Sequence, residues 1–384
     1  MKKYVEEEFY ELNEIYDRMP YDQQLIKKQN FVSETFAKNR LAISLLPIIA
    51  NPMPLNYRHK VIVSATNIKT NGRFKIRLGL FKEGSKDIIP GVVNHIHDKD
   101  INSLLVNVEK ILQKYKLEAY NSKYPKGIIK HVLVRKSFFN KTMMLVFVTQ
   151  GHIFPNHKSI IKEITALHPM VKTVIQNIHN IDTPVVILDK SQVLWGPGYI
   201  EDKIEELTFR LSPNSFYQVN PAQMINLYQT ALNFAKITQE EVVMDCYSGI
   251  GTISLLAGKL AKEVIAVESN KDAVKDSMFN KKANNIANVL FFNSDVEQFI
   301  LNYEKEIDIL IMDPARDGAS VMFLESIKKL KPKRIIYISC FVETQVRDLM
   351  ILRDLYEIVN VQPVDMFSYT SHIENIVSLK LRKK

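Results

Sequence analysis

Residues 242–252 read VVMDCYSGIGT, a short apolar run that ends in an aspartate and a turn with two glycines. The apolar run is typical of a strand buried on both faces, and a helical pattern follows it over 252–261. Outward from this stretch, strands and helices alternate through residues 210–384. The alternation predicts an α/β fold: a doubly wound, mostly parallel sheet covered by helices on both faces.

The expected helices of this region cover 221–236, 252–261, 271–285, 296–303, 320–330 and 343–352. Two last apolar runs, YEIVNVQPVDMF and ENIVSLKLRK, have no helix between them and predict an antiparallel hairpin at the sheet edge. Upstream, an α+β region is expected, with helices at 100–118 and 157–168, strands at KVIVSAT, FKIRLGLF, HVLVRKS and TMMLVFVTQ, and a hairpin from TPVVILD to QVLWGPGYIED. A further helix is expected over 22–38.

Composition and charge divide the chain further. With 384 residues, 46% hydrophobic and 24% charged, it is an ordinary globular sequence of two or three domains and not a disordered chain. We expect domains at 1–48, 49–209 and 210–384. Of the net charge of +9, residues 49–209 hold 23 Lys and Arg against 13 Asp and Glu, a surplus of +10. Such a surplus is typical of a domain that binds a phosphate backbone, and a merely lysine-rich surface is the alternative.

The two cysteines are too few for a disulfide scaffold, an iron–sulfur cluster or a cysteine-built zinc site, and no metal site is expected. The first residues, MKKYVEEEFYELNE, turn acidic where a signal peptide would turn apolar. No run approaches the roughly 18 apolar residues that span a bilayer. We therefore expect a cytoplasmic protein with no membrane partner. The sequence does not give the oligomeric state, and a monomer is the default expectation.

Acidic residues stand where four consecutive strands end: Asp245, Glu268, Asp295 and Asp313. In a doubly wound sheet, ligands bind at this edge. The GxG turn lacks the third glycine of a dinucleotide site, and an acidic turn suits a cationic amino-acid ligand better than a pyrophosphate. Glu268 follows Gly249 at the distance expected for a carboxylate that binds two ribose hydroxyls. The set favours S-adenosylmethionine, and a generic nucleotide loop with another ligand is the alternative.

Two more residues belong at the same edge or next to it. Cys340 ends the strand IIYISC, so its thiol should face the ligand cleft, whereas Cys246 reads as a small buried apolar residue. Glu374 enters the last apolar strand. It is either an exposed edge residue or a functional carboxylate.

Five motifs, in order and spacing, resemble the RNA uracil-C5 methyltransferase family, which depends on S-adenosylmethionine. They are FYQVNP (216–221), DCYSGIGT (245–252), DPAR (313–316), ISC (338–340) and VDMFSYTSHIE (364–374). The resemblance covers essentially all of 210–384 and implies a Rossmann-like methyltransferase domain there. Upstream, YDQQL (21–25), YRHK (57–60), HVLVR (131–135) and QNI (176–178) resemble the 23S ribosomal RNA branch more than the transfer RNA branch.

The resemblance implies a role for each matching residue. Cys340 would be the nucleophile and Glu374 the proton acceptor. Separately, a thiolate that forms at neutral pH needs a positive or hydrogen-bonding neighbour, and Arg316 is a candidate. Cofactor-binding residues would be Gln218, Tyr247, Glu268 and Asp313, assisted by Gly249 and Asp295. Residues 1–48 would pack on the methyltransferase domain, and 49–209 would bind RNA.

The sequence departs from the family at four points. The TRAM barrel and the four iron–sulfur cysteines of many ribosomal members are expected to be absent. DPAR replaces the family's Asp-Pro-Pro-Arg, and Phe341-Val342 replaces the Asn-Pro after the nucleophile. The second change puts the local loop and a uracil contact in question, but it removes no reacting group.

Three alternatives to ribosomal RNA methylation follow. One is methylation of transfer RNA, and another is a catalytically inactive relative that still binds RNA. DNA cytosine methylation is set aside, because its cysteine follows a proline in a loop whereas Cys340 ends a strand. RNA contacts are expected at Lys126, Lys130, Arg135 and Lys136.

Overall fold

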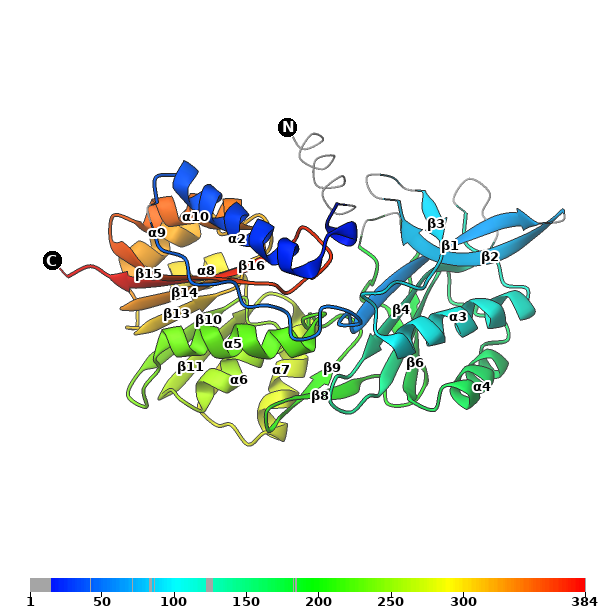
Figure 1. Cartoon of the computed structure of the whole chain (residues 1–384). Helices are drawn as coiled ribbons and strands as arrows, with labels where there is room; N and C mark the ends of the chain where they lie inside the picture. Colours follow the sequence, from blue (N-terminus) through cyan, green and yellow to red (C-terminus); the bar gives the residue numbers. More distant parts are fainter. Residues whose placement is uncertain are drawn as a thin grey trace. The chain divides into compact units, whose positions relative to one another are not determined.

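The structure is a computed structural model that describes residues 15–41, 43–70, 72–82, 85, 87–121, 127–181, 183 and 185–383. These residues form two compact units (Figure 1). The central unit comprises Leu55–Lys203 and Arg210–Ser215. The C-terminal unit comprises 15–54, Ile204–Phe209 and 216–383. Expected RNA contact Lys126 lies outside the described residues.

The C-terminal unit is built on a seven-stranded sheet in the order β12-β11-β10-β13-β14-β16-β15. Its strands are β10 (Val242–Cys246), β11 (Glu263–Glu268), β12 (Val289–Asn293), β13 (Ile309–Met312), β14 (Arg334–Ser339), β15 (Tyr356–Val364) and β16 (Glu374–Leu381). Strands β10 to β14 are parallel, and β16 runs antiparallel to both β14 and β15. The predicted α/β fold and the terminal hairpin are confirmed.

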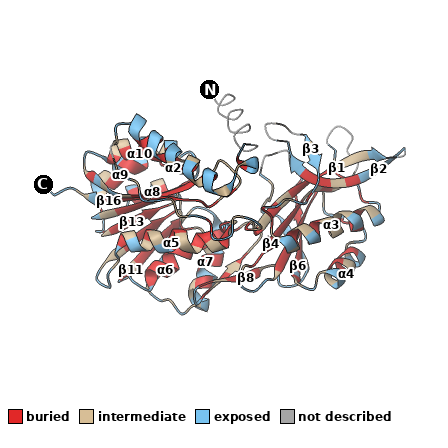
Figure 2. Ribbon diagram, viewed as in Figure 1, coloured by how far each residue is buried: buried red, intermediate tan, exposed pale blue. Residues whose placement is uncertain are grey.

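Helices cover both faces of this sheet, as Figure 1 shows. One face carries α2 (Tyr21–Lys38), α8 (Val296–Leu301), α9 (Val321–Leu330) and α10 (Val342–Leu352); the other carries α5 (Pro221–Ala235), α6 (Thr252–Gly258) and α7 (Lys271–Ala283). Val32 and Phe36 bring α2 into the same apolar core as α9 and α10. Figure 2 shows the strands buried between these helices.

Helices α3 (Lys99–Lys114), α6, α7 and α8 end two to four residues earlier than the sequence predicts. After Gly258 the chain continues α6 as a turn, and the Asn288 side chain binds carbonyls there: Asn288 Nδ2 donates to Gly258 O at 2.8 Å and to Ala261 O at 2.9 Å.

The central unit holds a second seven-stranded sheet, in the order β3-β2-β1-β4-β5-β6-β7. Its strands are β1 (Lys60–Thr70), β2 (Arg73–Phe81), β3 (Ile88–Pro90), β4 (Ile129–Lys136), β5 (Met143–Thr149), β6 (Val171–Ile178) and β7 (Ser191–Trp195). Helices α3 (Lys99–Lys114) and α4 (His157–Leu167) pack against each other and against the sheet. Strands β8 (Ile200–Ile204) and β9 (Leu207–Leu211) form a separate pair.

The hairpin predicted between TPVVILD and QVLWGPGYIED is wrong. The described residues of TPVVILD form no strand, and β7 pairs instead with β6, which the sequence did not predict. The Asn177 side chain holds the backbone of the first segment: Leu188 N donates to Asn177 Oδ1 at 3.0 Å, and Asn177 Nδ2 donates to Leu188 O at 2.6 Å. A side chain thus satisfies the backbone groups that a strand would have paired.

Among the helices of the described residues, none combines the length and the apolar character that crossing a membrane requires.

Candidate active site

The candidate residues meet at one edge of the C-terminal sheet because of strand direction. Parallel strands β10, β11, β13 and β14 end at this edge, and antiparallel β16 begins there with Glu374. The register of β14 and β16 pairs Ser339 with Asn375. Cys340 and Glu374 are the next residues beyond this last pair. The charge of Glu374 acts on the Cys340 thiol, so the thiol and the carboxyl are neighbours at the sheet edge.

The turn after β10 is shaped by positive φ angles. Tyr247 adopts φ +66°, which is unusual for a residue with a side chain, and Gly249 and Gly251 adopt +56° and +82°. A Cβ on Gly251 would lie 2.6 Å from the Phe291 ring, so only glycine fits there. A Cβ on Gly249 would meet no atom within 4 Å, so the space beside this turn is open to a ligand.

Glu268 lies beneath this turn at the end of β11. Its Oε2 accepts from Gly249 N at 2.9 Å, and its Oε1 accepts from Asn270 N at 2.7 Å. Two backbone donors therefore fix the carboxylate in place at the open side of the glycine turn. The sequence placed Glu268 and Gly249 in one site, and the structure brings them into contact.

A row of carboxyls continues from Glu268 along the strand ends. Burial and the charge of Glu268 raise the pKa of Asp245 to about 7, although Ser254 Oγ donates to Asp245 Oδ2 at 2.5 Å and opposes the shift. Burial and the charge of Asp245 raise the pKa of Asp313. A cation placed beside this row would relieve the repulsion between its members.

Glu374 ends the row next to the thiol. It is 3% exposed, and its Oε2 has no hydrogen-bond partner among the described residues. Burial, followed by the charge of Asp313, raises the pKa of Glu374 well above its ordinary value, and Arg316 lowers it in part. An unpaired buried carboxyl oxygen of raised pKa has the properties of a group that exchanges a proton with a ligand.

The two cysteines have different surroundings. Cys246 is 1% exposed and belongs to the apolar core, whereas Cys340 is half-buried at the sheet edge. Burial and the nearby Glu374 and Asp313 raise the pKa of the Cys340 thiol to about 12. Arg316 acts in the opposite direction, as expected of it, but burial and the two carboxyls outweigh it. Cys340 is thus a protonated thiol in the ligand-free protein.

The other candidates lie further from the thiol. Asp295 caps α8, with Oδ1 accepting from Gln298 N at 3.0 Å, and its side chain is exposed. The Tyr247 ring packs edge-on against Phe323, with centroids 5.8 Å apart. Gln218 is buried in the segment before α5. The structure therefore brings Cys340, Glu374 and Asp313 together, with Glu268 and Gly249 further along the same edge.

Two contacts at this edge are found only in the structure. Arg316 Nη2 lies 3.0 Å from His372 Nδ1, which joins the DPAR segment to the loop before β16. Tyr228 of α5 hydrogen-bonds with Thr252, and burial together with Asp313, Asp245 and Glu374 raises the pKa of its phenol. A tyrosine within an apolar helix carries no signal that would have marked it in the sequence.

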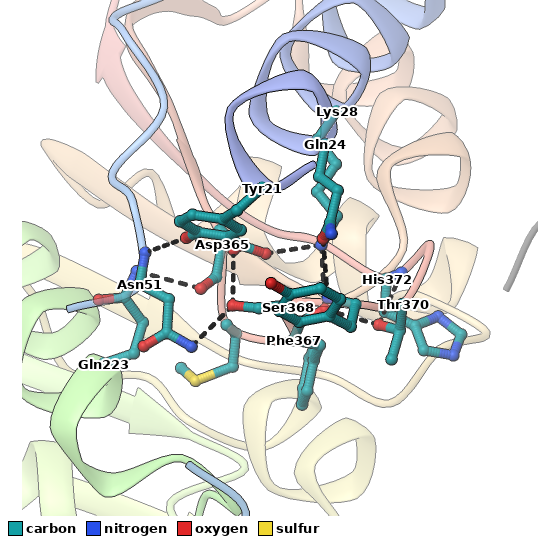
Figure 3. A network of polar contacts seen from close by, with 12 residues as sticks. Tyr21, Gln24, Lys28, Asn51, Gln223, Asp365, Phe367, Ser368, Thr370 and His372 are labelled. Atoms are coloured by element: carbon teal, nitrogen blue, oxygen red, sulfur yellow. Dashed lines mark hydrogen bonds and ion pairs between the residues drawn. The ribbon is translucent and has the colours of Figure 1, made fainter. Parts of the chain in front are cut away.

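A polar network fixes the loop that leads into β16 (Figure 3). Lys28 Nζ of α2 donates to Asp365 Oδ1 at 2.6 Å, and the two side chains are 1% and 0% exposed. Asp365 Oδ2 accepts from Tyr21 OH at 2.7 Å and from Ser368 Oγ at 2.9 Å. Asn51 Nδ2 completes the network by donating to Ser368 Oγ at 2.8 Å.

The same helix also holds the loop backbone. Lys28 Nζ donates to Phe367 O at 3.0 Å, and Gln24 Oε1 accepts from Tyr369 N at 2.8 Å. Tyr369 adopts φ +61°, a conformation that such outside contacts stabilise. Helix α2 therefore sets the path of the chain just before Glu374.

Two of the expected RNA contacts are wrong. Arg135 is buried, and its guanidinium donates to Ser212 O at 3.1 Å and to Ser215 O at 2.6 Å. Lys136 is also buried and forms ion pairs with Asp98 at 2.8 Å and Asp100 at 2.5 Å. These cations bind the protein itself, because they follow strand β4 into the interior of the central unit. In the part of the chain that the structure describes, no group of three or more His, Cys, Asp or Glu side chains could hold a metal ion.

The chain is similar to known RNA methyltransferases. An RNA methyltransferase of Oceanobacillus iheyensis, itself uncharacterised, is 39% identical over 371 residues, covering 95% of this chain and 80% of that protein. A second, from Clostridium acetobutylicum, is 38% identical over 370 residues, covering 94% and 80%.

A solved structure shares the fold. The crystal structure of the Pyrococcus abyssi tRNA (uracil-54, C5)-methyltransferase with S-adenosyl-L-homocysteine matches with a TM-score of 0.76 at 22% identity, over 94% of this chain and 84% of that one. Residues 185–382 match the family described as tRNA (uracil-5-)-methyltransferase. The chain is therefore an RNA methyltransferase and belongs to the tRNA (uracil-5-)-methyltransferase family.

Proposed function

We propose that this enzyme transfers the methyl group of S-adenosylmethionine to C5 of a uridine in RNA, with Cys340 as nucleophile and Glu374 as base. The observation that carries the proposal is the nearness of the Cys340 thiol to Glu374, whose buried Oε2 has no hydrogen-bond partner among the described residues. The reaction needs one thiolate and one proton acceptor on the same uracil ring, and this pair supplies both.

The residues at the sheet edge fit S-adenosylmethionine. Glu268, held by two backbone donors, would bind the ribose hydroxyls, while Asp313 and the exposed oxygens of Asp295 would bind the rest of the nucleoside and amino-acid portions. Gln218 and Tyr247 would line the same site. The sulfonium cation would lie beside a row of carboxyls whose pKa is raised by burial and, to a lesser degree, by their neighbours' negative charge. When bound, the cofactor supplies an electrophilic methyl group.

Cys340 begins the chemistry by losing its proton to solvent and adding to uracil C6. This addition turns C5 into an enolate carbon that can accept the methyl group. Arg316 favours the thiolate, and neutralisation of Asp313 by a cation would remove part of the opposing charge. The thiolate is thus expected to form once the site is filled and not before.

Glu374 completes the reaction. After methylation C5 still carries its proton, which Glu374 removes as the electron pair of that C–H bond forms the C5–C6 double bond and expels the Cys340 thiolate. A raised pKa suits this task, because a carboxylate of low pKa is a weak base. The uridine must leave its stack to reach the pair, so a loop in the RNA is the expected target.

Two RNA classes are candidates. The four upstream motifs support 23S ribosomal RNA. Transfer RNA is the second candidate, because the matching family and the solved relative carry transfer RNA in their names. The alternative function is that of an inactive relative that still binds RNA. Its support is the change of the two residues after Cys340. In the structure Phe341 caps α10 and Val342 begins it, so a regular helix still follows the nucleophile.

The deciding experiment maps 5-methyluridine by mass spectrometry in ribosomal and transfer RNA from cells with and without the gene. The purified enzyme is then incubated with each unmodified RNA and S-adenosylmethionine. Loss of one 23S uridine methylation, restored by wild type and not by Cys340→Ala, is expected. Restoration only in transfer RNA would shift the target, and methylation by Cys340→Ala at the wild-type rate would refute the nucleophile.

A further inference from the structure

We propose that the turn between β4 and β5, residues 137–142, is a second binding site for the RNA and holds an unpaired nucleotide. The Phe139 ring stacks on the base, while Lys141 of the turn and Lys203 of β8 bind the phosphates beside it. The inference rests on the proposed function for its ligand class, RNA. It concerns residues that take no part in the methyl transfer.

A buried carboxylate holds this turn in one conformation. Asp202 of β8 is 0% exposed and accepts four hydrogen bonds. The donors are Ser137 Oγ at 2.9 Å, Phe138 N at 2.8 Å, Phe139 N at 2.8 Å and Lys203 N at 2.9 Å. The backbone that carries the Phe139 ring is therefore fixed before a ligand arrives, which lowers the entropy cost of binding.

Further contacts close the turn and tie its tip to β8. Ser137 N donates to Thr142 O at 2.8 Å, and Asn140 N donates to Ser137 Oγ at 2.9 Å. Asn140 Nδ2 donates to Glu201 O at 2.8 Å. Lys141 adopts φ +59°, a conformation that such outside contacts stabilise. The turn is thus a rigid support for the side chains at its tip.

The two aromatic residues of the turn have different surroundings. Phe138 is half-buried, and its ring packs edge-on against the buried His59, with centroids 5.4 Å apart. Phe139 is 58% exposed. An exposed aromatic ring on a fixed backbone is a general means of stacking an unpaired RNA base. The tip therefore offers one ring to a ligand while its neighbour anchors the turn.

Two cations lie over these rings. Lys203 Nζ is 4.8 Å from the centre of the Phe139 ring, and Lys141 Nζ is 4.6 Å from the centre of the Phe138 ring. Neither lysine forms an ion pair with a carboxylate in the part of the chain that the structure describes. An aromatic face orients an ammonium ion without neutralising it, so both charges are available to phosphate groups.

The chemistry of the tip favours unpaired RNA over an acidic protein surface. A flat ring between two cations matches a base between two phosphates, and residues 49–209 carry the surplus of positive charge. An acidic protein would bind the lysines as well, but it would need only an apolar side chain at residue 139 and not a flat one. The two partners therefore make different demands on Phe139.

The test measures binding of the full chain to fluorescein-labelled single-stranded hexauridylate and hexa-adenylate and to an RNA duplex. Loss of one stacked base costs about tenfold in affinity, so Phe139→Ala should weaken binding of both single strands by about that factor. Phe139→Trp should restore it. Phe139→Leu should not, because its side chain is apolar but has no flat face. Duplex binding should stay within about twofold, since the bases of a duplex are not available for stacking.

The control for Phe139→Ala is Leu167→Ala. Leu167 ends α4 with 56% exposure, close to that of Phe139, and it has no ring. This variant should bind like wild type. Single-strand binding by Phe139→Ala equal to wild type, or an equal loss in Leu167→Ala, would overturn the inference. Full rescue by Phe139→Leu would also overturn it and would indicate a protein contact.

The lysines are tested through salt. Lys141→Met and Lys203→Met should each reduce the slope of log affinity against log salt by about 0.7, the value for one phosphate contact on a single strand. Methionine keeps an apolar stem on the phenyl face, so only the charge is lost. Lys162→Met, which removes an exposed lysine from α4, should leave the slope unchanged. Equal slopes in all three variants would show that the turn binds no phosphate.

The outcome is independent of the methylation assay, because hexamer binding needs no target uridine. If the enzyme methylates no uridine and the hexamer results hold, the proposed function fails and the nucleotide site stands. With an active target RNA, Phe139→Ala should raise KM about tenfold and leave kcat unchanged. A fall in kcat at unchanged KM would show that Phe139 supports the fold or the chemistry and would reject the site.

Discussion

Lys28 and Asp365, 337 residues apart in the chain, form an ion pair of 2.6 Å in which both side chains are buried. The pair joins α2 to the loop that leads into β16, whose first residue is Glu374. Residues from outside the matched segment 185–382 thus fix the start of the strand that holds the proposed base.

Lys28→Met should lower both stability and turnover. Removing one partner of a buried pair leaves the other charge uncompensated and costs about 3–5 kcal/mol, seen as a lower midpoint in urea. The double variant Lys28→Met, Asp365→Asn should regain most of that stability, because no buried charge remains. If the pair positions Glu374, kcat stays low in the double variant while KM for RNA does not change.

The control for this prediction is Lys27→Met on the same helix. Lys27 is half-buried over the Tyr16 ring, 5.2 Å from its centre, and pairs with no loop residue named in the network. It should keep wild-type kcat. A double variant with full activity would show that the Lys28–Asp365 pair serves stability alone.

Glu374→Gln should trap the enzyme on its RNA. The amide keeps the shape of the side chain but cannot accept a proton at neutral pH, so addition and methyl transfer proceed and elimination stalls. A denaturing gel should show a protein band shifted by the RNA, with methylated uridine in it. The band should disappear in Cys340→Ala, Glu374→Gln. Free turnover of the single variant would mean that another group takes the C5 proton.

Cofactor affinity should increase with pH through about 7. The pKa of Asp245 is about 7 in the folded protein against an ordinary 3.8, so this carboxyl is largely protonated at pH 6 and ionised at pH 8. A cation prefers the ionised row, so S-adenosylmethionine should bind more tightly at pH 8 than at pH 6 and release protons at pH 6. Calorimetry in buffers of different ionisation enthalpy measures both. S-adenosylhomocysteine, which lacks the sulfonium charge, should show a smaller pH dependence.

The same shift has a consequence for stability. Because the folded pKa of Asp245 is raised, the folded state binds more protons than the unfolded state between pH 3.8 and about 7. The contribution of Asp245 to stability is therefore lost as the pH rises across this window. Asp245→Asn should flatten that part of the stability profile of the cofactor-free enzyme. An unchanged profile would show that Asp245 keeps its ordinary pKa.

Arg135→Met should destabilise the central unit without changing how RNA affinity depends on salt. The guanidinium holds the carbonyls of Ser212 and Ser215, and leaving such groups unsatisfied costs about 1–3 kcal/mol. Lys75→Met, which removes an exposed cation from β2, should do the reverse: unchanged stability and a flatter salt slope. If Arg135→Met instead flattened the dependence of RNA affinity on salt, Arg135 would contact RNA after all.

The sequence predicted the parts of the site that depend on strand order. Asp245, Glu268 and Asp313 end parallel strands, and any doubly wound sheet brings such residues to one edge. That Cys340 and Glu374 lie near each other depends on the register of one antiparallel pair, which the sequence suggested only through the family resemblance. The alternation of apolar and polar residues also gave a wrong prediction for Arg135. Within HVLVRKS it does not distinguish an exposed arginine from a buried one, because the partner that binds Arg135 lies about 80 residues away in the sequence.

Lys28 illustrates a different limit. A lysine on an amphipathic helix reads as a solvated residue, because its burial depends on Asp365 at the other end of the chain. Only long-range contacts reveal it.

That separation has a consequence for biosynthesis. The ribosome adds about 5–20 residues per second, so Lys28 emerges roughly 17–70 s before Asp365, its partner 337 residues later. During that interval α2 cannot take its final place, because it would bury a lone ammonium ion. The nascent chain therefore acquires the proposed base Glu374 and the Lys28–Asp365 ion pair that fixes the loop before it in the same late step. An enzyme whose active site forms only when nearly the whole chain has been synthesised does not methylate RNA while it is still a nascent chain.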